Sequence, residues 1–71
     1  MKKLISIEGM SCGHCVKHVE EALAEVNGVE KVAVSLQDKQ AVVELKQEVE
    51  DSRLKEAVEE AGYEVTAIKG I

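Results

Sequence analysis

Aromatic residues and proline are almost absent from this sequence: Tyr63 is the only aromatic side chain, and there is no proline. The core can therefore be built only from aliphatic side chains of modest volume, mainly Val, Leu, Ile and Ala. A chain of 71 residues forms one small domain, whose stability depends on filling that core well. The hydrophobic content of 45% and the charged content of 32% are those of a folded domain rather than a disordered chain.

Basic residues and long apolar runs are scarce as well. Nine Lys and Arg residues stand against fourteen Asp and Glu residues, a net charge of −5. This balance disfavours nucleic acids and anionic membrane surfaces as partners, because both are bound through basic side chains. No run approaches the roughly 20 apolar residues that span a bilayer, and the first residues do not form a signal peptide. We therefore expect no membrane insertion and a cytoplasmic location, where thiols stay reduced.

Strand-like alternation and helix-like spacing of apolar residues follow one another along the chain. The predicted elements are a strand at 3–8, a helix from about 14 to 26, strands at 32–36 and 41–46, a helix from about 52 to 61, and a strand at 63–69. Asn27-Gly28 and Gly62 are expected to end the two helices, and Ser52 to cap the start of the second.

The order of these elements, β-α-β-β-α-β, predicts the fold. Two half-polar helices and four short strands bury their apolar faces together when both helices cover one side of an antiparallel sheet. We therefore predict an α+β fold, a ferredoxin-like sandwich with a four-stranded antiparallel sheet and two helices on one face. Residues 1–71 should form a single domain.

Two cysteines, Cys12 and Cys15, lie three residues apart where the first strand gives way to the first helix. With Cys12 in the loop and Cys15 in the first helical turn, both sulfurs can converge beyond the start of the helix. Unpaired backbone N–H groups and the positive end of the helix dipole favour the thiolate form there. Thiolates are the ligands that soft metal ions prefer.

The number of thiols indicates the kind of ion. A structural zinc site needs four donors, whereas the chain contains only two cysteines. Two thiolates suit Cu(I), although Ag(I), Hg(II), Cd(II) and Zn(II) remain possible substitutes. A pair of ligands on an exposed loop leaves the ion open to attack by another protein's thiolate, which suits transfer better than storage.

Other residues of the loop are candidates for supporting roles. Gly9 and Gly13 are expected to give the backbone the freedom that brings both sulfurs together. Met10 is read as an apolar anchor of the loop in preference to a thioether ligand. His14 is expected to tune the electrostatics around Cys15 rather than to bind metal, and ligation by His18 is less favoured still.

The segment Gly9-Met10-Ser11-Cys12-Gly13-His14-Cys15 resembles the heavy-metal-associated domain family, as do Asn27-Gly28-Val29 and Glu60-Ala61-Gly62-Tyr63-Glu64-Val65. The family includes small bacterial copper chaperones and the N-terminal metal-binding domains of copper-transporting P-type ATPases. The resemblance extends over essentially the whole chain. It implies that Cys12 and Cys15 are copper ligands, that Met10 is a buried anchor, and that Tyr63 lies in a loop beside the site. A core aromatic at the start of the last strand is the alternative for Tyr63.

The leading hypothesis is thus a cytosolic Cu(I) chaperone, not an enzyme, that passes copper by ligand exchange to an acceptor such as a copper-transporting P-type ATPase. A metal-binding regulatory domain of a transporter is one alternative, and a thiol–disulfide redox module is another. The redox alternative is weakened by the absence of the cis-proline found beside such sites in thioredoxin-like folds. Two exposed dithiol loops could also share copper in a metal-bridged homodimer.

Overall fold

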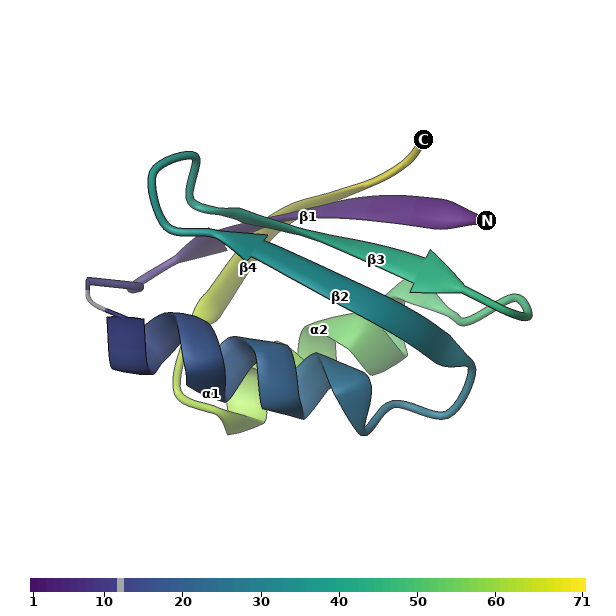
Figure 1. The fold of residues 1–71 in the computed structure, drawn as a ribbon, viewed down its shortest axis with the longest axis horizontal. Coiled ribbons are helices and arrows are strands. Elements are labelled where there is room, and N and C mark those ends of the chain that lie inside the picture. Colours follow the sequence, from purple (N-terminus) through teal and green to yellow (C-terminus); the bar gives the residue numbers. More distant parts are fainter. Residues whose placement is uncertain (12) are drawn as a thin grey trace.

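The computed structural model describes residues 1–11 and 13–71, and the predicted elements appear there in the predicted order. They are β1 (Lys2–Glu8), α1 (Gly13–Ala24), β2 (Val29–Ser35), β3 (Gln40–Leu45), α2 (Asp51–Glu60) and β4 (Glu64–Gly70). The strands form one antiparallel sheet in the order β2-β3-β1-β4. Both helices lie on the same face of that sheet (Figure 1). The predicted ferredoxin-like α+β sandwich is confirmed.

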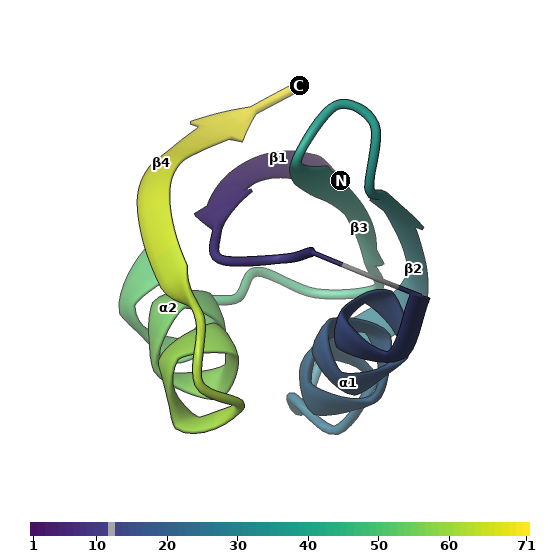
Figure 2. The ribbon, with the colours of Figure 1, turned by 90° about the vertical axis from the view of Figure 1, so that its left-hand side faces the viewer.

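The sheet arches over the two helices, which lie side by side beneath it (Figure 2). Because β1 and β3 are neighbours in the middle of the sheet and run antiparallel, the helices that follow them also run in opposite directions. The start of α1 and the end of α2 therefore meet at one end of the molecule, beside the loop that leaves β1.

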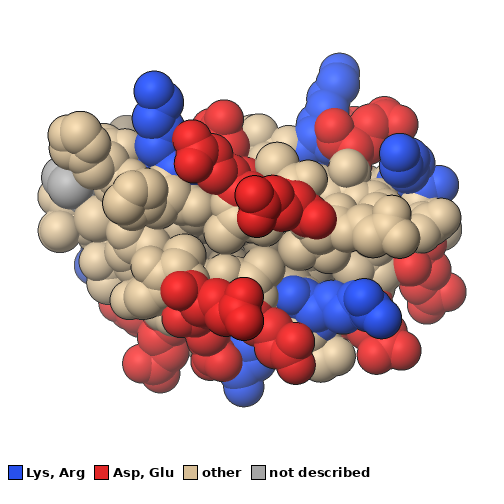
Figure 3. All heavy atoms as spheres, turned by 90° about the horizontal axis from the view of Figure 1, so that it is seen from below, with Lys and Arg blue, Asp and Glu red and all other residues tan. Residues whose placement is uncertain are grey.

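The negative charge of the chain is concentrated on the helices. Together α1 and α2 carry six acidic and three basic residues. Figure 3 looks at the side of the molecule formed by the helices and shows acidic side chains in two bands with an uncharged strip between them. In the part of the chain that the structure describes, neither helix is long and apolar enough to cross a membrane.

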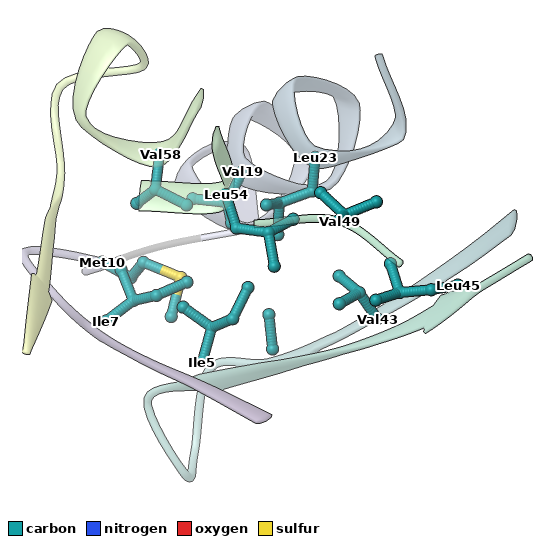
Figure 4. Packing of buried hydrophobic residues seen from close by; sticks show 11 residues of the cluster. Ile5, Ile7, Met10, Val19, Leu23, Val43, Leu45, Val49, Leu54 and Val58 are labelled. Carbon is teal, nitrogen blue, oxygen red and sulfur yellow. The ribbon is translucent and has the colours of Figure 1, made fainter. Parts of the chain in front are cut away.

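The core lies between the sheet and the helices (Figure 4). Ile5 and Ile7 lie on one face of β1 and are buried, and the helices contribute apolar side chains spaced four residues apart. The largest fully buried side chains are Ile5, Ile7, Val19, Leu23, Val43, Leu54 and Val58. All are aliphatic, as the scarcity of aromatic residues requires.

The end of α1 differs from the sequence-based prediction. The helix ends at Ala24 rather than at Asn27-Gly28. The backbone tightens there, since the N–H of Val26 donates to the carbonyl of Leu23, three residues back, at 3.1 Å. Gly28 lies beyond this turn and is buried with a φ of +101°.

The start of α2 also differs, because Ser52 is not its N-cap. The helix begins at Asp51, and Glu50 occupies the N-cap position with an extended backbone and no capping side-chain hydrogen bond. Asp51 pairs with Lys3 of β1, whose Nζ also donates to the carbonyl of Val49 at 2.9 Å. A carboxylate in the first turn is favourable for the helix dipole, and the ion pair ties this end of α2 to the sheet.

Two apolar residues of the predicted strands are exposed. Leu36 lies in the β2–β3 turn, outside β2, and is 37% exposed. In β4, Ser6 pairs with Ala67 but the next residue of β1 pairs with Val65, so Thr66 is the extra residue of a bulge. The bulge shifts the alternation, so that Ile68 packs against the core and Ala67 faces solvent.

Candidate metal centre

The loop between β1 and α1 begins with a backbone conformation that favours glycine. Gly9 has a φ of +99°, which L-residues with a side chain rarely adopt. The role expected for Gly9, to help bring both sulfurs together, stays a prediction. Gly13 differs: it is the first residue of α1, its φ is not in the left-handed region, and an added Cβ would meet nothing within 4 Å.

Cys15 is the third residue of α1, in the first helical turn where the sequence predicted it. Its side chain is half-buried and packs against the core, with Sγ 4.0 Å from the hydroxyl oxygen of Ser11. A sulfur at the start of a helix is stabilised as a thiolate by the unpaired N–H groups and the helix dipole. Cys12, the other predicted ligand, lies outside the described residues. Cys15 thus offers one soft donor at the edge of the molecule.

Met10 is buried, with 7% of its surface exposed, although it belongs to the loop. Its side chain lies close to Ile7 in the core (Figure 4). Such burial is what an anchor of the loop requires, and it keeps the thioether sulfur away from solvent.

Tyr63 is brought to the loop by the end of α2. The N–H of Gly62 donates to the carbonyl of Glu59 at 3.0 Å, and the N–H of Tyr63 donates to the carbonyl of Val58 at 3.3 Å. With a φ of +99° at Gly62, these bonds form a Schellman motif, which reverses the chain at the helix end. The half-buried ring packs against the core and lies beside Gly9. Both interpretations of Tyr63, as a neighbour of the loop and as a core aromatic, describe part of its position.

His14 and His18 are exposed on α1. Within residues 1–11 and 13–71, no three His, Cys, Asp or Glu side chains gather closely enough to hold a metal ion. In this part of the chain, neither histidine therefore belongs with Cys15 to a group of three such donors.

Two features near the loop were not predicted from the sequence. One is the proximity of Ser11 to Cys15, for which the four-residue spacing at the start of a helix was an available signal. The other is a shallow hollow beside Tyr63 that is lined by Glu8, Glu64 and Lys55, among others. These residues come from β1, β4 and α2, and no sequence pattern connects them.

Comparison with known proteins gives consistent matches over most of the chain. The heavy-metal-associated domain family matches residues 4–64. The copper chaperone CopZ of Enterococcus hirae is 41% identical over 69 residues, which cover 96% of this chain and 100% of that protein. The solved structure of a CopZ metallochaperone has a TM-score of 0.87 at 39% identity and covers 93% of this chain and 100% of its own. A copper-binding domain from HMA7, a P-type ATPase, has a TM-score of 0.85 at 36% identity, with coverages of 99% and 100%.

Proposed function

This chain belongs to the heavy-metal-associated domain family, and we propose that it is a copper-binding chaperone that carries Cu(I) on Cys12 and Cys15. One observation carries the proposal: the similarity to a copper chaperone extends over 96% of this chain and 100% of the relative. We propose further that residues 1–71 act as a single metal-binding domain and that the chain is a carrier rather than an enzyme.

Two thiolates three residues apart suit the low coordination number of Cu(I). Cys15 is half-buried and Ser11 is exposed, which supports a site at the border between core and solvent. Other soft or borderline ions, namely Ag(I), Hg(II), Cd(II) and Zn(II), would compete for the same donors.

Transfer would be a sequence of ligand exchanges without any change in the oxidation state of copper. An acceptor thiolate forms a new Cu–S bond, giving a three-coordinate ion, and one donor Cu–S bond then breaks. A second exchange completes the transfer, and the protons lost by the acceptor thiols are balanced by protonation of Cys12 and Cys15.

We propose that the acceptor is a copper-transporting P-type ATPase or its metal-binding domain, and that the exchange takes place in the cytoplasm. The similarity to a copper-binding domain of a P-type ATPase supports this choice, because donor and acceptor would then present dithiol loops on the same fold. A metal-bridged homodimer would use the same loops face to face.

The test is a Cu(I) titration against a coloured Cu(I) chelator under anaerobic conditions. The wild-type chain should take up one tight equivalent, and Cys12→Ser and Cys15→Ser should each lower the affinity by at least about 100-fold. Lys31→Gln, on the exposed surface of β2, is the control and should leave the affinity unchanged. Full retention of binding in either serine variant would refute the site.

The coordination and the oligomeric state need separate measurements. X-ray absorption should show two or three sulfur ligands at copper, whereas four light-atom ligands would point to zinc instead. Sedimentation at increasing copper loading separates a monomeric carrier from a copper-bridged dimer. A thioredoxin-like rate of insulin disulfide reduction would revive the redox alternative.

The match to an ATPase domain also favours a second candidate, in which this sequence is a metal-binding regulatory domain of a larger transporter. The chemistry of the two thiols would be the same. An immunoblot of the native cell extract distinguishes the two, because a chaperone should migrate near 7.7 kDa and a transporter far above that mass.

A further inference from the structure

A groove of about 580 Å³ separates the outer surfaces of α1 and α2. Its lining includes none of Gly9, Met10, Cys15 and Tyr63, so it is distinct from the candidate metal centre. In Figure 3 the strip without charged residues runs between the acidic bands of this side of the molecule.

The floor of the groove is apolar and made of short side chains. Ala22 and Val26 contribute from α1 and the turn after it, and Ala57 and Ala61 contribute from α2 and its C-cap. All four are half-buried. Ala57 and Ala61 are four residues apart on one face at the end of α2, whereas Ala22 and Val26 lie on either side of the end of α1. The small volume of these side chains leaves the space between the helices unfilled.

The rim of the groove is acidic. Glu25 lies on the α1 side, and Glu56 and Glu60 lie one turn apart on α2. All three are exposed. In the described residues the ion pair found is that of Lys3 with Asp51, so none of these three carboxylates forms an ion pair with a basic side chain of those residues.

At one end of the groove the lining is not acidic. Arg53 and Asn27 line it there and offer hydrogen-bond donors. A ligand that runs along the groove would therefore meet carboxylates over most of its length and a guanidinium at one end, which gives it a preferred direction.

We propose that this groove docks an extended, lysine-bearing segment of a partner protein. The stretch of α2 from Arg53 to Ala61 is about 12 Å long, which matches roughly four residues of extended chain. Glu56 and Glu60 are about 6 Å apart, close to the spacing of about 6.6 Å between alternate residues of such a segment. Lysines at alternate positions can therefore reach both carboxylates, and small residues between them cover the apolar floor.

A second copy of this chain fits the groove less well, because each copy carries a net charge of −5. The proposal does not depend on copper, since no residue of the groove is a candidate metal ligand. Docking here would leave the loop that contains Cys12 free to meet an acceptor.

The experiment uses the ¹⁵N-labelled chain and an end-capped peptide of four alternating Lys and Ala pairs, followed by NMR at moderate salt. The largest amide shifts should fall at Ala22, Glu25, Ala57 and Glu60. The double variant Glu56→Gln/Glu60→Gln should bind the peptide at least about fivefold more weakly, which corresponds to the loss of two partly exposed charge pairs. A matched double variant, Glu30→Gln/Glu44→Gln, removes the same charge from the sheet and should bind like the wild type.

A third variant separates the groove from simple charge attraction. Ala22→Gln adds no charge but fills the groove from α1, so it should also weaken binding. Equal losses in the two double variants, an unchanged affinity in Ala22→Gln, or shifts spread over all acidic surfaces would overturn the proposal. Each variant should still bind one equivalent of Cu(I); this keeps failure of the groove separate from failure of the proposed copper site.

Discussion

The aromatic ring of Tyr63 lies against the backbone of Gly9, so that a Cβ added to Gly9 would come 3.6 Å from Tyr63 Cδ1. The two residues are far apart in the sequence, and it is the pairing of Glu8 with Glu64 that brings them together. The turn after α2 thereby covers one side of the loop after β1. A substitution that removes the Tyr63 ring should therefore also affect the loop after β1.

Replacement of Tyr63 by Ala should lower the free energy of unfolding by about 2 kcal/mol, because a half-buried aromatic ring loses its packing. Tyr63→Phe keeps the ring and should cost less than about 1 kcal/mol. Urea denaturation measures both. If the ring also shields the proposed copper site, a chelator should remove Cu(I) faster from the Ala variant than from the Phe variant. Equal stabilities of the two variants would contradict the packing described.

Substitutions of Met10 test whether its side chain anchors the loop or binds the metal. Met10→Leu should change stability by less than about 1.5 kcal/mol, because it conserves volume in the core. Met10→Ala should cost about 2–5 kcal/mol, because it leaves a cavity next to Ile7. Neither change should alter the stoichiometry of Cu(I) binding. A Leu variant that folds normally but loses Cu(I) affinity would show that the thioether binds the metal.

The hydroxyl of Ser11 should have a small effect on copper affinity, because it lies close to the sulfur of Cys15. Its hydroxyl oxygen is 4.0 Å from Cys15 Sγ, a distance at which the hydroxyl can donate weakly to a thiolate. Ser11→Ala removes that donor and should change the Cu(I) affinity by no more than about tenfold. Ser11→Thr keeps the hydroxyl and is the control in the same chelator competition. A loss as large as that of Cys15→Ser would give Ser11 a more direct role than the one described here.

Gly28 should tolerate no side chain. It has a φ of +101°, and a Cβ there would lie 2.7 Å from Val49 Cγ2, an atom of a buried and rigid side chain. Gly28→Ala should therefore destabilise the fold by at least about 2 kcal/mol. Gly13→Ala is the matched control, since it meets no atoms within 4 Å and should leave stability unchanged or improved. Thermal unfolding of both variants measures this difference in stability.

Copper itself should stabilise the fold if the proposed site exists. A ligand that binds only the folded state at about 1,000 times its dissociation constant adds roughly 4 kcal/mol to the free energy of unfolding. The melting temperature of the wild-type chain should rise with Cu(I) and return to its starting value after chelation. The double variant Cys12→Ser/Cys15→Ser should show no rise, and a rise of wild-type size would place the metal elsewhere.

Local sequence signals predicted most of the fold and the position of Cys15. The alternation of Ile5 and Ile7 and the four-residue spacing of Val19 and Leu23 are periodic properties of the chain itself, so element type and order follow from them. The position of Cys15 in a first helical turn follows from the change between strand-like alternation and helix-like spacing of the apolar residues. The register of strand pairing does not follow from them, so the bulge in β4 and the exposure of Ala67 had no signal in the sequence.

What the sequence by itself determined is thus the β-α-β-β-α-β order, an aliphatic core, and the position of Cys15 in the first turn of a helix. Only the tertiary structure decided which distant residues meet: Tyr63 with Gly9, Lys3 with Asp51, and the carboxylates of α2 with that of the turn after α1 around one groove. The physical reason is that hydrophobic periodicity acts over a few residues, whereas these contacts depend on how the strands align and how far apart the helices pack. The sequence alone does not indicate whether small side chains such as Ala22 and Ala57 are buried or exposed. They form the floor of a groove only because the two helices face each other.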